Sequence, residues 1–422
     1  MLQSKCKKIF SELSDFFISD EKVISQTVQL YKAMKLDTIK TGLKDYRQAT
    51  YRKVDILLIH LLMPLFDVYS PVDYLNSWLA RQFQACSSTL YRFKNDAMVN
   101  WRSICTQVYK RLNEYVSRQG EDNPDSPRCI IIDDTDLPKT GKFIEHVGKI
   151  WSHTIGRSIL GFKGLFVGYW DSKTFQCIDF SLHKELGKNQ KQPYGLPKKV
   201  LSRQYSKYRD DNTPGYKRES ELYESKIENA KEMLKRAIKN RIKFDYLLID
   251  SWFMCSTLIK FVLDCKANIL GMCKMGKTKY LYCNKELSAS DILKRLRRKS
   301  KLKWYKRLGL YSLQCEVEIK GTKIKLFFCR NTRRGKWHML LTTDTSLTLE
   351  RAYEYYSIRW SIEVFFKEAK QYFGLTDCQS QDFDGQVADI SKVVMHYNIF
   401  SIMKRFTDYE TLGELFREIK GQ

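Results

Sequence analysis

The sequence predicts an α/β protein: a mixed core that contains a β-rich insertion, with a helical domain before it and a helical tail after it. Three observations support this prediction. Apolar residues recur at helical spacing from the start of the chain to about residue 120. Two apolar runs, 129–136 and 244–252, end on aspartates, as buried strands that present acids at their ends do. Alternating, strand-like segments then fill 310–344.

The first 125 residues are predicted to form a helical, DNA-binding domain. Apolar positions at helical spacing include Phe10, and prolines such as Pro64 interrupt the series. The segment Ala80–Asp96 reads as two short helices, the second capped by Ser87 or Ser88. It suits a helix-turn-helix that reads DNA, although an ordinary amphipathic helix fits it as well. The acidic, proline-containing stretch 121–128 is predicted to be a linker.

The predicted core begins at 126 and its first part extends to 274. After the strand 129–136, the segments 164–171 and 175–182 predict a hairpin, and the polar stretch 184–217 predicts an exposed loop. A helix (219–241), a strand (244–252), a helix (256–265) and a strand (267–274) follow. Three strands in a meander, followed by a helix, a strand, a helix and a strand, match the order of the ribonuclease-H-like fold.

The β-rich insertion is predicted at 275–343. It contains a basic helix, 291–300, and strands at 310–320, 322–330 and 336–344, joined by turns at Gly321 and Gly335. The core is predicted to resume at 344–378, with one helix from Leu347 to Gly374 that Ser346 or Thr348 caps. The region 379–422 is predicted to be a helical tail.

Composition favours a polyanionic partner. Lys and Arg exceed Asp and Glu by 25, and the chain has 25 Tyr and 8 Trp. Cations neutralise phosphates and aromatic rings stack on bases, so nucleic acid is the partner that fits best. The twelve Cys form no C-x-x-C pair, and the first residues contain no apolar run of signal-peptide length. We therefore expect reduced thiols in a cytoplasmic, nucleoid-associated protein that does not use a membrane.

The predicted helix 347–374 carries the most informative pattern in the chain. Tyr356, Arg359, Glu363 and Lys370 fall within a wedge of roughly 60° on a regular helix. A buried helix with an ordinary Glu363–Lys367 pair is the alternative. The spacing Y-x2-R-x3-E-x6-K resembles the signature of the insertion-sequence-four family of bacterial DDE transposases. The resemblance covers approximately residues 128–378.

This resemblance implies roles for individual residues. Glu363 would be the third metal-binding carboxylate, and Tyr356, Arg359 and Lys370 would contact the terminal phosphates of the element. The same DNA-binding face is expected to include Lys367. If excision passes through a DNA hairpin, an exposed base would stack on a tryptophan of the insertion, Trp304 or Trp337.

The two remaining catalytic and metal-binding acids are expected at the ends of the two core strands. Asp133, Asp134 and Asp136 are adjacent, and strand alternation does not say which face is the site. The family's Asp-Thr pairing favours Asp134, with Asp133 as the alternative. Asp250 is preferred to Asp245 because it ends its strand rather than starting it. The expected cofactor is Mg²⁺, for which Mn²⁺ can substitute.

The predicted function is that of a cut-and-paste transposase of an insertion sequence. Its partners would be double-stranded DNA, namely the terminal inverted repeats of the element and target DNA, and it would act as a homodimer. Two other classes remain open: a non-catalytic DNA-binding descendant of a transposase, and a ribonuclease-H-fold nuclease of repair or recombination. His146 and His153 are predicted to be structural or to face DNA rather than to bind a metal.

Overall fold

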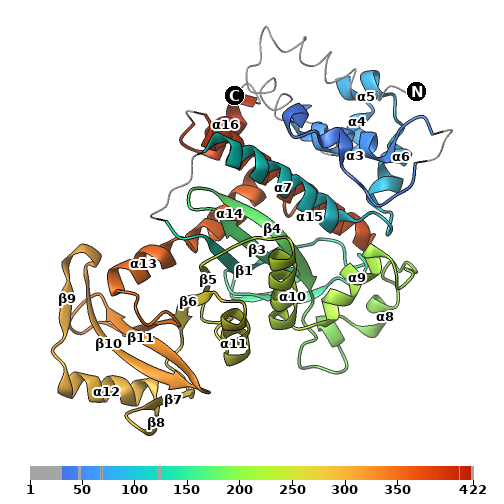
Figure 1. Cartoon of the computed structure of the whole chain (residues 1–422). Coiled ribbons are helices and arrows are strands. Elements are labelled where there is room, and N and C mark those ends of the chain that lie inside the picture. The colour runs from blue at the N-terminus through green and yellow to red at the C-terminus, as the bar shows by residue number, and fades with distance from the viewer. Residues whose placement is uncertain are drawn as a thin grey trace.

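The computed structural model describes residues 31–45, 49–66, 68, 70–120, 126–407 and 409–419. Figure 1 shows a mixed sheet at the centre of the molecule, with long helices from both ends of the chain packed together along one side. The insertion extends away from the core at the opposite side. The early apolar positions such as Phe10, and residues 121–125 of the predicted linker, lie outside the described residues.

The core sheet has the order β4-β3-β1-β5-β6. β1 runs antiparallel to β3, which runs antiparallel to β4, whereas β1, β5 and β6 are parallel neighbours. This arrangement fits a ribonuclease-H-like fold, and it confirms the predicted α/β class with a mixed sheet and helices at both ends. The strand β2, which pairs with the start of β3, was not predicted. The bounds are β1 Cys129–Pro138, β2 Gly148–Ser152, β3 Arg157–Trp170, β4 Phe175–His183, β5 Tyr246–Ile249 and β6 Asn268–Cys273.

Both faces of this sheet are covered, which explains the uninterrupted apolar run in β1. Ile130 and Ile132 belong to one apolar cluster with residues of α10 (Lys226–Lys239) and α11 (Ser256–Asp264). Cys129 and Ile131 belong to another, with residues of α14 (Trp360–Tyr372) and α15 (Phe383–Arg405). Alternate residues of β1 therefore point to opposite helical layers.

The insertion continues the core sheet instead of forming a separate one. β12 pairs with β6 of the core on one side and with β11 on the other. Lys320 and Gly321 both have positive φ, which gives the tight two-residue turn between β10 and β11. The insertion elements are β7 Lys279–Tyr282, β8 Lys285–Ser288, α12 Ala289–Lys299, β9 Lys303–Tyr305, β10 Leu310–Ile319, β11 Thr322–Arg330 and β12 His338–Thr342.

Several helices differ from their predicted bounds. The predicted single helix 347–374 is two helices, α13 and α14, which meet at Ile358 and Arg359. Thr348 caps α13 as predicted, whereas α6 is preceded by Cys86 rather than capped by Ser87 or Ser88. The predicted loop 184–217 contains two short helices, α8 and α9, and the next helix starts at Lys226. The remaining bounds are α3 Lys53–Leu62, α4 Pro71–Tyr74, α5 Trp78–Phe83, α6 Ser87–Lys94, α7 Trp101–Gln119, α8 Lys198–Leu201, α9 Pro214–Ser220, α13 Leu349–Ser357 and α16 Leu412–Ile419.

The helix α15 is the centre of the helical layer. Nineteen of its 23 residues are buried, because it packs against α7 of the N-terminal region, β4 of the sheet and α14. The N-terminal helices, the tail and one face of the sheet thus share a continuous apolar core. The domain boundaries given above remain predictions. None of the described helices has the length and apolar character needed to span a bilayer.

Two buried histidines join the helices α3, α6 and α15. His60 Nε2 donates to Leu90 O at 3.2 Å, and His396 Nε2 donates to Leu61 O at 3.0 Å. Burial, helped by the charge of Lys392, lowers the pKa of His60 to about 3 and that of His396 to about 4. Both side chains therefore stay neutral in the folded protein at pH 5.

Acidification is therefore expected to destabilise this layer. Because the unfolded chain binds these protons near pH 6.5, stability falls as the pH drops below that value, by about 2 kcal/mol per histidine at pH 5. Thermal melting at pH 7 and pH 5 measures the loss. The His60→Gln/His396→Gln variant keeps amide donors that do not titrate, so its melting temperature should fall clearly less. An equal fall in both proteins would contradict this origin.

Candidate active site

The middle of β1 and the C-terminal end of β5 bring two of the predicted acids together. The parallel register pairs Ile132 with Ile249, so the next residues along the two strands are Asp133 and Asp250. Asp133 follows the alternation of Cys129 and Ile131 and therefore faces α14, the helix that carries Glu363. Three acids from separate parts of the chain meet at this edge of the sheet.

Arg359 lies between two of these acids. Its Nη1 donates to Asp133 Oδ2 at 2.7 Å, and its Nη2 donates to Glu363 Oε1. Burial raises the pKa of Asp133 to about 6; the nearby Arg359 opposes this shift, and the charge of Asp250 adds to it. Burial also raises the pKa of Tyr356, whose hydroxyl is hydrogen-bonded to the backbone of Met272 in β6. The structure thus groups Asp133, Asp250, Glu363, Arg359 and Tyr356.

Asp134, the acid preferred from the sequence, does not join this group. Its side chain points to the opposite face of the sheet, where Oδ2 accepts a hydrogen bond from Lys226 Nζ at 2.5 Å. Lys226 is the first residue of α10, which covers that face. The geometry therefore favours Asp133, the alternative, as the partner of Asp250 and Glu363. Which of the two aspartates is catalytic stays a prediction. Asp136 pairs with Lys163 of β3.

The predicted DNA-binding residues occupy different places. Lys370 Nζ donates to Thr135 Oγ1 at 2.7 Å, so Lys370 lies beside the acid group, whereas Lys367 is exposed on α14. The two predicted tryptophans both lie in the insertion. Trp304 is 46% exposed and contacts Tyr311, with ring centroids 4.5 Å apart. Trp337 is half-buried under the guanidinium of Arg330.

The two short helices predicted as a DNA reader exist as α5 and α6. Lys94, however, is buried, and its Nζ pairs with Asp389 of α15. Arg92 remains exposed. Part of the presumed recognition face is therefore used for internal packing.

The acid group suits a divalent cation. Its donors are carboxylate oxygens, which are the ligands that Mg²⁺ and Mn²⁺ prefer. The guanidinium of Arg359 already bridges two of them, so a metal ion would have to displace it. Asp133, Asp250 and Glu363 are the residues that would hold the metal.

A second group of possible metal ligands is occupied by an internal ion pair. In the part of the chain that the structure describes, ligand atoms of Glu145, His146 and Glu219 lie within 4.8 Å of one another. The fully buried Arg209 makes two hydrogen bonds to Glu145, at 2.9 and 2.7 Å, and lies 3.5 Å from Glu219. This positive charge disfavours a metal, which agrees with a structural role for His146. His153 is exposed, after β2.

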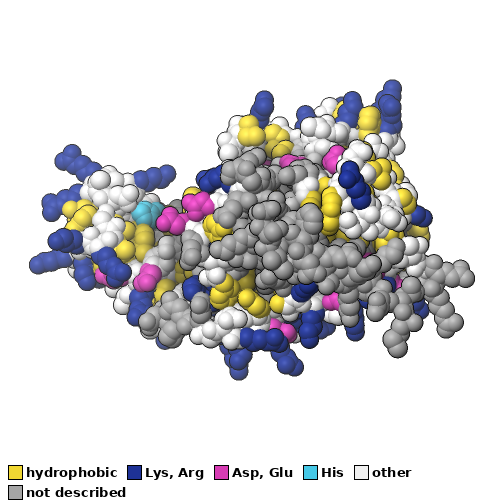
Figure 2. Space-filling view, turned by 90° about the horizontal axis from the view of Figure 1, so that it is seen from above, with side chains coloured by type: hydrophobic (Ala, Val, Ile, Leu, Met, Phe, Trp, Pro, Cys, Tyr) yellow, Lys and Arg dark blue, Asp and Glu magenta, His cyan; other side chains and the backbone are white. Residues whose placement is uncertain are grey.

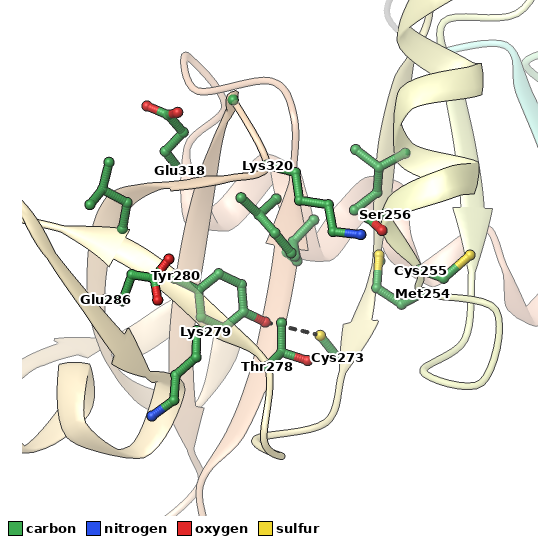
Figure 3. A pocket seen from close by; sticks show the side chains of 15 residues that line it. Met254, Cys255, Ser256, Cys273, Thr278, Lys279, Tyr280, Glu286, Glu318 and Lys320 are labelled. Atoms are coloured by element: carbon green, nitrogen blue, oxygen red, sulfur yellow. Dashed lines mark hydrogen bonds between the residues drawn. The ribbon is translucent and has the colours of Figure 1, made fainter.

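An open pocket of about 690 Å³ lies where the insertion meets the core, and Figure 3 shows its lining. Met254 and Cys255 come from the segment that leads into α11, and Lys279 and Lys320 come from hairpins of the insertion. None of the three acids lines it. The acid group is therefore a separate site.

Two protein-family models match this chain. A family model described as "DDE superfamily endonuclease" matches residues 41–270, and one described as "Transposase DDE domain" matches residues 223–399. A search of curated proteins finds no match. Among solved structures, the NurA nuclease from Sulfolobus solfataricus is 8% identical, over 72% of this chain and 97% of that chain, with a TM-score of 0.23. A score this low supports no inference about the fold.

Proposed function

Because this chain belongs to the DDE superfamily of endonucleases, we propose that it is the transposase of a bacterial insertion sequence, of the insertion-sequence-four type. The observation that carries the proposal is the meeting of Asp133, Asp250 and Glu363 at one edge of the sheet. If Glu363 only formed an ordinary helical ion pair with Lys367, the presence of Asp133 and Asp250 beside it would have no explanation.

In this proposal, the acids hold Mg²⁺, and bound Mg²⁺ would activate the attacking water or 3′-hydroxyl and stabilise the leaving oxygen. Arg359 and Lys370 bind DNA phosphates on either side of the acid group. The planar guanidinium of Arg359 can donate two hydrogen bonds to one phosphate, whereas the ammonium of Lys370 acts as a point charge. Tyr356 donates one hydrogen bond. Hydrolysis of a phosphodiester would free a 3′-hydroxyl at the element end. That hydroxyl would attack a phosphodiester of the target strand, join to its 5′-phosphate and release a target 3′-hydroxyl.

The partners we propose are the terminal inverted repeats, target DNA and a second copy of the chain. Basic side chains on the insertion provide a surface for the DNA backbone, and Figure 2 shows Lys and Arg side chains projecting from this lobe on the left. From the start of α12 to residue 307 the exposed cations are Lys294, Arg297, Arg298, Lys299, Lys301, Lys303, Lys306 and Arg307. Contacts of this kind are independent of sequence, so they would hold DNA while other residues select the site.

The test is cleavage of an end-labelled DNA fragment that spans the flank of this gene, with Mg²⁺ or Mn²⁺. We expect nicking at one defined position, and EDTA should remove it, because the carboxylates alone do not activate water. Sequence-specific binding without nicking would overturn the proposal in favour of a non-catalytic descendant. Cutting without a preferred position would overturn it in favour of a general nuclease.

A further inference from the structure

Trp252 is an exposed side chain that is nevertheless held in place. It stands two residues after Asp250 and is 48% exposed. Its backbone N–H donates to Asp250 Oδ1 at 2.8 Å, and its ring meets the buried Phe253 edge to face, with centroids 4.9 Å apart. The indole is therefore fixed to the acid site while much of its surface faces solvent.

Lys226 lies against the ring of Trp252. Its Nζ lies 4.4 Å from the centre of the Trp252 ring, and it also donates to Asp134 Oδ2. The lysine side chain is only 16% exposed, so the ammonium is confined between the carboxylate and the ring. Asp134 thus holds a cation on an aromatic surface, on the side of the sheet opposite Asp133. Sequence reasoning missed both Lys226 and Trp252, although Trp252 is only two residues after the predicted acid Asp250.

The position of this pair identifies its ligand. Trp252 is two residues from Asp250, so its Cα lies within about 7 Å of the acid's Cα. A DNA strand whose phosphate reaches the acids therefore brings a neighbouring nucleotide to the indole. An aromatic surface beside a cation suits the flat face of a base next to a phosphate. The face of a base is open only when the base is not stacked within a duplex.

We propose that Trp252 and Lys226, positioned by Asp134, form a binding site for one unpaired base of the DNA strand that occupies the acid site. This proposal rests on the proposed function for the identity of that strand. The base stacks on the exposed part of the indole, and the charge of Lys226, which Asp134 holds against the ring, attracts the adjoining phosphate. The neighbouring aspartates Asp133 and Asp134 then serve two sites on opposite faces of one strand.

The first experiment measures binding alone, in Ca²⁺, so that no cleavage is needed. Fluorescence anisotropy compares a single-stranded 20-mer of thymidine with an abasic 20-mer of the same charge. The wild-type protein should prefer the thymidine strand by about tenfold, since stacking on one aromatic ring favours a base by roughly that factor. Trp252→Ala should lose most of this preference and bind the abasic strand as before. Trp252→Tyr keeps an aromatic face and should retain part of the preference.

Trp151→Ala is the matched control, because Trp151 is 45% exposed on β2 and is assigned no role in binding. An unchanged preference in Trp252→Ala, or an equal loss in Trp151→Ala, would overturn the proposal.

A 5-iodouracil strand should also crosslink to Trp252, and Lys226→Gln should lower both the base preference and the salt dependence of binding. Crosslinking confined to other residues would count against the site.

A second measurement separates this site from the proposed function. The wild-type protein and Trp252→Ala are compared on the flank fragment, fully paired or with unpaired bases around the nick. If the wild type cuts and Trp252→Ala cuts both fragments equally well, the base site is wrong and the transposase proposal stands. If the wild type cuts neither, the transposase proposal fails, while the binding result still decides whether Trp252 holds a base.

Discussion

Asp133→Asn is expected to lower metal-dependent DNA cleavage by about a thousandfold or more, and Asp134→Asn by no more than about tenfold. The first change removes a carboxylate oxygen from the group that faces Glu363, whereas the second alters a contact with Lys226 on the other face of the sheet. Asparagine keeps the shape of either side chain, so both variants should fold. The measurement is the initial rate of nicking of the flank fragment in Mn²⁺.

Glu363→Gln should lose as much cleavage as Asp133→Asn, while both of these variants bind DNA within about a factor of three of the wild type in Ca²⁺. Glu354→Gln is the control, because Glu354 is an exposed glutamate on the preceding helix, α13. The reverse order, with Asp134 essential and Asp133 dispensable, would show that Asp134 is the metal-binding acid, as the Asp-Thr resemblance implies. Equal losses of binding and cleavage would deny these acids a catalytic role.

Arg359→Gln is expected to change metal binding and DNA binding in opposite directions. In the free protein the Arg359 guanidinium bridges Asp133 and Glu363, and a divalent cation must displace it from both. Hydrogen bonds between charged groups contribute about 1.5–3 kcal/mol, so removing the arginine should raise Mn²⁺ affinity by about tenfold or more. DNA binding should weaken, with the salt slope smaller by about one, since one phosphate contact is lost.

Calorimetric titration of Mn²⁺ into the DNA-free protein checks the first effect, and anisotropy at several salt concentrations checks the second. DNA should raise the Mn²⁺ affinity of the wild type, because phosphates offer Arg359 another partner, but not that of Arg359→Gln. Arg351→Gln, on the exposed side of α13, serves as the matched arginine control. Unchanged Mn²⁺ affinity in Arg359→Gln would mean that the arginine does not compete for the carboxylates.

The sequence predicted the core strands well because β1 begins with a short apolar run and β5 consists of one. The acids follow β5, as predicted, but lie inside β1, which continues to Pro138. It did not predict which face of β1 bears the site, since both faces are buried and the hydrophobic pattern is the same on each. The choice between Asp133 and Asp134 depends on which helices cover each face, and the covering helices α10 and α14 come from distant parts of the chain. Lys226 and Asp134 are 92 residues apart in the sequence, so no local sequence pattern predicts their contact.

The signature residues were found through their spacing, although the helix that carries them is interrupted. Ile358 and Arg359 keep helical backbone angles at the junction of α13 and α14, so the spacing still places Tyr356, Arg359 and Glu363 near one another. The strand β2 was missed because it is five residues long and contains glycine and polar residues. Short strands of this kind are defined by their partner, here the long β3, more than by their own composition.

The burial of α15 has a consequence for the order in which the protein is made. The ribosome completes β4 at residue 183 but reaches the end of α15 only at residue 405, roughly ten to forty seconds later. During that interval the apolar faces of α7 and β4 have no α15 to cover them, and α14 with Glu363 is also still to come. The nascent chain must therefore stay open or be bound by a chaperone, and its acid site cannot be assembled until α14 has been synthesised.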